Sequence, residues 1–346
     1  MRFIPPAARW LLMGPRRQLA LALALAALLP AGLKGQEARP ASRDAGDFAS
    51  KKLPPGKGFR VFLVADMEGM ASAVDTHEVI AGVEGERYRS LTSSDYWDRF
   101  RSLLTKEVNA AIAGAREGGA GSFVVNEGHG GNLFANVLPW ELDPDAILVR
   151  GWPKPIVMIT GLDESFGTLM FTGAHANAGS PGVMAHNFAF DDFTVNGKKL
   201  NEVGINALIA GEMGVSVSLV SGDDVLVAET REMLGSGFIG VVVKKAIGRN
   251  AAITWSPARV RSLIEEAAKD AVRRERKGEF APFLMEKPYQ VAFTLRATYP
   301  PEYAEGVAGL EGFGLERKSD RSFVLTTTDA KLIGHLLDAV EEVVLK

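Results

Sequence analysis

The sequence predicts an α/β protein in which a mostly parallel central sheet is flanked by helices, with a smaller C-terminal α+β subdomain from about residue 256. Two observations indicate this class. Short apolar runs that suit buried strands alternate with segments of helical periodicity. Several of these runs end in glycine-rich loops that carry a carboxylate or a histidine. Functional sites in parallel sheets lie at such strand ends.

The composition is that of a globular protein without cysteine chemistry. The 346 residues are 47% hydrophobic and 23% charged, with a formal net charge of -3. A mildly acidic chain lacks the basic face of a nucleic-acid binder, so we expect no nucleic-acid partner. Because there is no cysteine, disulfides, thiol catalysis and thiolate metal sites are excluded. Any metal site must use His, Asp and Glu.

The N-terminus has the pattern of a secretory signal over residues 1–35. Arg16-Arg17 precedes an apolar run at 19–29, which Pro30 ends. The run is too short to span a bilayer comfortably, and the alternative is a buried N-terminal helix. Residues 36–57 have the composition of a linker, which leaves 58–346 as the folded domain. We therefore expect an exported protein, periplasmic or extracellular, with no stable membrane anchor after cleavage.

The first half of the folded region alternates strands with one long helix. Apolar residues at helical spacing predict a helix over 94–116, which Gly118-Gly119 would end. Residues 70–93 show no clear period and are expected to form a long loop. The predicted strands lie at 58–65, 122–126, 146–150 and 167–171.

The second half begins with a turn at Ser180-Pro181-Gly182, which lets the chain double back and aim His175 and His186 at one place. A tight hairpin turn is expected at 195–198. Asn201 is expected to cap a helix that opens with Glu202 and runs to about Met213. The remaining predicted elements are strands at 215–220, 239–244, 289–297 and 322–328, and helices at 225–234, 256–277 and from Asp329 onward.

A pair of carboxylates follows the first strand. Asp66 and Glu68 are two residues apart, so an extended chain points both to the same face. Like charges held together repel each other and lose solvation. The pair therefore needs cations or a shared proton, or else it lies at a solvated strand end.

Three of the five histidines lie in glycine-rich loops just after predicted strands or one turn beyond. Two of them, His129 after the second strand and His175 after the fourth, lie at the same sheet edge as this acidic pair, and His186 lies one turn beyond. Imidazole and carboxylate ligands without thiolates suit Zn²⁺, with Mn²⁺ or Co²⁺ as alternatives. A third carboxylate would allow two ions. Each residue alone also fits a structural role, and His77 and His335 are assigned no function.

At this point the sequence resembles the DppA-type zinc D-aminopeptidases, from about Arg60 to the C-terminus. The matching motifs occur in the same order as in that family. They are Asp66-Met67-Glu68-Gly69, Val125-Asn126-Glu127-Gly128-His129, Gly173-Ala174-His175-Ala176, the segment 180–186 that ends in His186, the segment 201–207 that begins Asn201-Glu202, and Ser221-Gly222-Asp223-Asp224.

The resemblance implies two zinc ions per subunit, a catalytic histidine and a short-peptide substrate from which N-terminal D-amino acids are released. The implied ligands are Asp66 as the bridge, with Glu68, His129, His175 and Glu202. His186 matches the histidine that the family describes as a nucleophile. The resemblance also implies a homo-oligomer, a ten-subunit barrel. Glu127, Gly128 and Asn187 depart from residues common in the family and are expected to alter hydrogen bonds around the ligands.

We expect hydrolysis by a metal-activated water, with His186 as general acid/base or oxyanion donor, although a nucleophilic role stays open. Glu127 or Asp223 would anchor the substrate amine. One alternative is another dinuclear metallohydrolase, such as an L-aminopeptidase, an amidase or a phosphoesterase. A phosphoesterase is disfavoured because the loops that carry the ligands lack Arg and Lys. The other alternative is a non-catalytic exported metal-binding protein.

Overall fold

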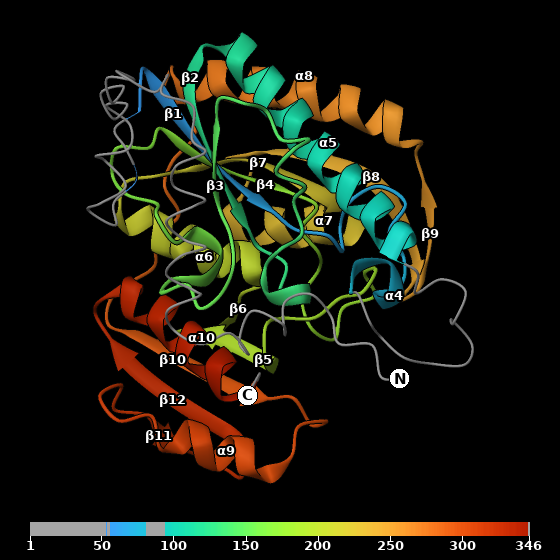
Figure 1. Ribbon diagram of the computed structural model, residues 1–346. Coiled ribbons are helices and arrows are strands. Elements are labelled where there is room, and N and C mark those ends of the chain that lie inside the picture. Colours follow the sequence, from blue (N-terminus) through green and yellow to red (C-terminus); the bar gives the residue numbers. More distant parts are fainter. Residues whose placement is uncertain (1–52, 54–55, 81–93, 345–346) are drawn as a thin grey trace, which may run out of the picture. The chain divides into compact units, whose positions relative to one another are not determined.

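Figure 1 shows the computed structural model of the chain, which describes residue 53 and residues 56–80 and 94–344. The predicted secretory signal and nearly all of the predicted linker lie outside the described residues, as do residues 81–93 of the predicted long loop. The described residues from 56 onward belong to one compact unit. None of the described helices is long and apolar enough to cross a membrane.

A seven-stranded sheet forms the centre of this unit, and its strands are parallel except for the last pair. The order is β3-β2-β1-β4-β7-β8-β9, and β8 and β9 pair antiparallel. The apolar runs of the sequence form these strands, so the mostly parallel sheet is confirmed. The strands are β1 (Phe59–Ala65), β2 (Ala120–Glu127), β3 (Ala146–Val149), β4 (Thr168–Thr172), β7 (Val217–Asp223), β8 (Ile239–Gly248) and β9 (Ala251–Thr254).

Helices cover both faces of the sheet (Figure 1). On one face α5 (Ser94–Gly118) packs along α8 (Pro257–Glu275), and on the other lie α6 (Glu202–Glu212) and α7 (Asp224–Leu234). The short helix α4 (Thr76–Val79) and two 3-10 turns, η3 (Gly131–Leu133) and η4 (Val157–Ile159), lie in the loops.

The helix that begins near residue 256, the predicted start of the smaller subdomain, packs with the parallel layer. This helix, α8, buries Val260, Ile264 and Val272 in the core of the large sheet. The two helices approach closely at Gly114, where a side chain would lie 1.9 Å from the Glu265 carbonyl oxygen. The apolar stripe of α8 therefore belongs to the parallel layer.

The smaller part is built on a five-stranded antiparallel sheet in the order β11-β12-β10-β5-β6. Its strands are β5 (Phe190–Val195), β6 (Lys198–Lys199), β10 (Tyr289–Leu295), β11 (Glu316–Arg317) and β12 (Ser322–Thr327), and its helices are α9 (Pro301–Ala308) and α10 (Ala330–Val344). The hairpin turn at 195–198 is confirmed. Strand β5 joins this sheet because Phe190 and Phe193 pack against each other and Phe190 packs against Phe293. The smaller part is therefore not purely C-terminal.

The strand order brings three loops to one place. From β1 the chain moves outward through β2 and β3 and then returns to β4 on the other side of β1, so the direction of strand addition changes beside β1. The strand ends are in register, with Ala65 opposite Glu127 in β2 and Thr172 in β4. At Gly69 a side chain would lie 1.7 Å from the Ala174 carbonyl oxygen, so the loops after β1 and β4 touch through their backbones.

Candidate metal centre and active site

The acidic pair lies where β1 leaves the sheet, and both side chains are buried. The Asp66 amide donates to the Thr172 carbonyl of β4 at 2.9 Å, which fixes the start of the loop. Asp66 is 2% exposed and Glu68 5%. The alternative of a solvated strand end is therefore wrong.

A buried lysine from β8 fixes the loop that follows β1. The ammonium of Lys244 donates to the carbonyl oxygens of Glu68, Met70 and Ala73. Burial lowers the pKa of Lys244 to about 8, against the opposing effect of nearby carboxylates. Nothing in the sequence singles this residue out, because it lies inside an ordinary strand pattern.

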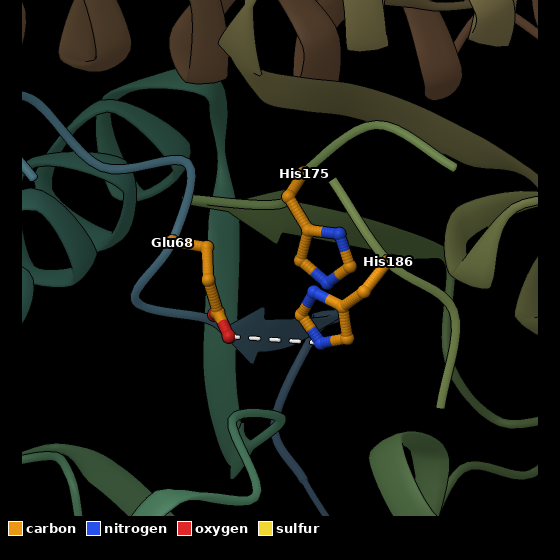
Figure 2. Close-up of side chains that lie close together, drawn as sticks. All are labelled: Glu68, His175 and His186. Atoms are coloured by element: carbon orange, nitrogen blue, oxygen red, sulfur yellow. Dashed lines mark ion pairs between the residues drawn. The ribbon is translucent and has the colours of Figure 1, made fainter. Parts of the chain in front are cut away.

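Three histidines converge on the acidic pair. His129 Nδ1 lies 2.8 Å from Glu68 Oε2, and His175 Nε2 lies 3.6 Å from Asp66 Oδ2. The turn at 180–182 folds back as predicted, so the rings of His175 and His186 stack with centroids 3.9 Å apart. Figure 2 shows these two rings lying face to face, with Glu68 reaching toward His186 Nε2 at 3.7 Å.

Glu202 completes the cluster from the first turn of α6. Asn201 caps this helix as predicted, accepting from the Gly204 amide, and so fixes the direction of the next side chain. Glu202 Oε2 lies 3.5 Å from His175 Nε2, and its Oε1 accepts from the Phe188 amide at 2.7 Å. All six residues that the sequence analysis assigned as ligands or catalytic histidine thus lie together.

The donor atoms form two groups that share Asp66. One group is Asp66, Glu68 and His129, and the other is Asp66, His175 and Glu202. Asp66 Oδ1 faces His129 and Oδ2 faces His175. A third grouping of Glu68 with His175 and His186 also has ligand spacing.

The hydrogen bonds of the histidines fit a bound cation. Each ring directs its other nitrogen at a backbone carbonyl: His129 Nε2 at Val79, His175 Nδ1 at Ala176 and His186 Nδ1 at Met184, at 2.7–3.0 Å. A carbonyl only accepts, so in the neutral ring that nitrogen carries the hydrogen. The inner nitrogen then points a lone pair at carboxylate oxygens. This contact is repulsive unless a cation or a proton lies between them, and metal-binding histidines are held in this way.

The charges of the cluster are strongly coupled. Burial and the neighbouring Glu68 raise the pKa of Asp66 well above its usual value. Burial acts the same way on Glu68, but the hydrogen-bonded His129 outweighs it and holds the pKa of Glu68 well below 4.5. Burial and the neighbouring His175 lower the pKa of His186 to about 4. Three carboxylates in one buried cluster need positive charge beside them, and the resident imidazoles or bound cations can supply it.

The cluster forms the floor of a cavity of about 390 Å³. Residues from the smaller part line its far side, namely Arg296, Tyr299 and Glu341. None of these three residues was predicted from the sequence. They follow strand β10 or lie on helix α10, far along the chain from the ligand motifs, and no spacing relates them to the site.

Two residues assigned as anchors for the substrate amine are not in this cavity. Glu127 is completely buried, and its Oε1 accepts from the Val137 amide at 2.8 Å. Asp223 is 1% exposed, caps α7 by accepting from the Leu226 amide, and accepts from the Val183 amide. Both carboxylates hold loops in place, and the structure does not bring Glu127 or Asp223 to the cavity where the substrate amine would lie.

Behind the cluster, Glu229 of α7 joins two segments of the chain. One is the loop that carries His175 and His186, and the other is the start of α6, which carries Glu202. Its carboxylate accepts from the Asn177 amide, the Ser180 hydroxyl and the Asn201 side chain. Asn187 adds to this network, because its amide donates to Asn177 Oδ1 and to the Leu200 carbonyl, each at 2.8 Å. Asn187 therefore takes part in the hydrogen bonds that hold the segments around the ligands, as expected from the sequence.

Comparison with known proteins gives a consistent result. A family model described as D-aminopeptidase matches residues 59–338. A D-aminopeptidase of Bacillus subtilis (strain 168) is 32% identical over 220 residues, which is 63% of this chain and 75% of that protein. A solved structure described as the Zn-dependent D-aminopeptidase DppA from Bacillus subtilis, a self-compartmentalizing protease, superimposes with a TM-score of 0.72. It is 27% identical, and the match covers 83% of this chain and 98% of that one.

Proposed function

The chain belongs to the D-aminopeptidase family, and we propose that it uses two zinc ions to release N-terminal D-amino acids from short peptides. The observation that carries the proposal is the position of Asp66, whose two oxygens face two separate groups of donor atoms. A bridging carboxylate of this kind is what a two-metal hydrolase requires.

In this proposal Glu68 and His129 would hold one ion, His175 and Glu202 would hold the other, and Asp66 would contribute to both. Neutral imidazole and carboxylate oxygen suit Zn²⁺, and Mn²⁺ and Co²⁺ remain alternatives. When bound, the ions supply Lewis acidity that polarises the scissile carbonyl and makes water a nucleophile near neutral pH.

We assign His186 to proton transfer. Its side chain is 27% exposed, against 2–3% for His129 and His175, so it is the histidine of the cluster that substrate can reach. Its Nδ1 is tied to the Met184 carbonyl, which leaves Nε2 on the side of Glu68 and Glu202. From there it can take a proton from the attacking water and return one to the leaving amine.

Metal stoichiometry tests the ligand assignment. Asp66→Ala should lose both zinc ions by elemental analysis, because the bridge belongs to both groups. The control is His335→Ala, a substitution of a possible ligand type outside the cluster. His335 is exposed on α10, so this variant should keep the metal content of the wild type. Two retained zinc ions in Asp66→Ala would refute the bridging role.

Activity is tested on paired D- and L-peptides, with and without a chelator. We expect D-peptides to be cleaved, and chelation to abolish cleavage until zinc is restored. A preference for L-peptides would instead support the alternative of an L-aminopeptidase on the same site. Bound zinc without hydrolysis of any peptide would support a metal-binding protein.

We also propose export to the periplasm or the outside of the cell, from the basic and apolar pattern of residues 1–35. Finally, we propose a homo-oligomer, with a ten-subunit barrel as the form that the family resemblance implies. The support is the relative described as self-compartmentalizing, together with exposed apolar side chains on the β8–β9 hairpin, Ile247 and Ile253.

A further inference from the structure

A second, smaller cavity of about 150 Å³ adjoins the metal centre. It shares Glu68, Ile80, His186 and Arg296 with the main cavity, so the two meet beside the proposed catalytic histidine. Arg249 lines only the smaller one. Two guanidinium groups therefore line this space, and Glu68 is the single carboxylate among its described lining residues.

Both arginines are held in place by backbone carbonyls on either side of His186. Arg249 Nη1 donates to the Ala185 carbonyl at 2.6 Å, and Arg296 Nη2 donates to the Phe188 carbonyl. A guanidinium has five N–H donors, so each keeps others for a ligand.

In the part of the chain that the structure describes, neither arginine lies within ion-pair distance of a carboxylate. Glu341 of the main cavity interacts with Arg296 at longer range, where burial raises the pKa of Glu341 to about 7 against the opposing charge of Arg296. Two guanidinium groups beside a metal centre, neither bonded to a carboxylate, indicate an anion subsite.

The position of the subsite indicates which anion it takes. When the first peptide bond of a dipeptide lies at the metal centre, the terminal carboxylate is one residue away, about 3.5 Å of extended chain. The smaller cavity adjoins the centre, because both are lined by Glu68 and His186. Its volume suits an end group rather than further residues.

We propose that Arg249 and Arg296 bind the C-terminal carboxylate of the peptide and so restrict the enzyme to very short substrates. Arginine suits this task because its planar fork can bind a carboxylate through two parallel hydrogen bonds. The inference rests on the proposed aminopeptidase function and adds how the substrate is selected. Both arginines lie far along the chain from the ligand motifs. For this reason the sequence of the loops that carry the ligands contains no Arg or Lys.

The test compares D-alanyl-glycine with D-alanyl-glycinamide, which differ only in the terminal charge. Wild type should prefer the acid in kcat/KM by about 10- to 100-fold, the range of charge-assisted hydrogen bonds. Arg249→Gln and Arg296→Gln should each remove most of this preference by raising KM for the acid. The kcat/KM for the amide should change by less than about twofold. Arg249→Lys, which keeps a charge, should recover part of it. The matched control is Arg259→Gln, whose guanidinium lies over Trp255 away from the cavity.

The outcomes separate the inference from the function on which it rests. If wild type cleaves acid and amide equally, or if the variants lose both substrates equally at full zinc content, the carboxylate subsite is wrong while the aminopeptidase stands. If wild type cleaves neither substrate, the proposed function fails. If inorganic phosphate changes amide cleavage in wild type but not in Arg249→Gln, the pocket binds a free anion, which also overturns the proposal.

Discussion

At the scale of single residues, the histidines of the site differ in what their exposure allows them to do. His129 and His175 are enclosed among carboxylates, whereas His186 stacks on His175 and faces the cavity. His186→Ala should therefore retain full zinc while kcat falls by about 10²- to 10⁴-fold, the usual contribution of a general acid or base. Elemental analysis and steady-state kinetics check this prediction. Unchanged hydrolysis at full zinc would contradict it, and a trapped acyl-histidine would favour a nucleophile.

Glu107 of α5 is a buried acid that gives the fold a pH dependence. Burial raises its pKa from 4.5 to about 7, against the opposing hydrogen bond from the Ala71 amide. The folded state thus holds this proton more tightly than the unfolded state, and stability falls as pH rises from about 4.5 to about 7. The loss is at most about 3 kcal/mol.

Glu107→Gln should remove this loss. Its unfolding free energy should exceed that of wild type at pH 8 and approach it near pH 5, as measured by urea denaturation with metal held constant. Glu266→Gln, on the exposed face of α8, is the matched control and should follow wild type at every pH. A constant difference between Glu107→Gln and wild type across this range would contradict the assignment.

At the scale of elements, the sequence was most informative where a local rule decides the structure. The apolar runs predicted the parallel strands, and Asn201 predicted the start of α6. Strand β5 was missed because Phe190-Asp191-Asp192-Phe193 has no strand alternation, and its pairing with β10 is set by tertiary contact. The packing of α8 on α5 was not predicted for the same reason, because it depends on contacts between residues far apart in the sequence.

Helix α7 contributes to the site through Glu229, which joins the loop after β4 to the start of α6. Glu229→Gln leaves one acceptor oxygen for three donors, so these segments should move apart slightly. We expect zinc affinity to fall about 10- to 100-fold, as for other residues that orient metal ligands. Competition with a chromogenic chelator measures this. Glu232→Gln, an exposed neighbour on the same helix, should bind zinc like wild type, and equal affinities in both variants would refute the role of Glu229.

At the scale of the whole molecule, the site could be predicted only as far as its residues lie in motifs. Five of these residues follow a strand or begin a helix, at ends that the α/β pattern brings together, and the sixth, His186, reaches the site through the turn at 180–182. The five are Asp66, Glu68, His129, His175 and Glu202. The groups that shape the cavity, such as Arg296 and Glu341, come from the other sheet and its helix. Their contact with the site depends on how the two sheets pack, which no periodicity in one sequence encodes.

The β8–β9 hairpin is a candidate surface for the association of subunits. Strand β9 is an open edge of the large sheet, and the hairpin exposes 68% of Ile247 and 65% of Ile253. An exposed edge with apolar side chains favours association, so we expect this hairpin to lie in the subunit interface. Ile247→Glu with Ile253→Glu should convert the oligomer to smaller species in light scattering, because the interface would then bury unpaired charges. Leu284→Glu, at another exposed apolar residue, should leave the assembly intact. Dissociation by Leu284→Glu, with an intact oligomer in the double variant, would place the interface elsewhere.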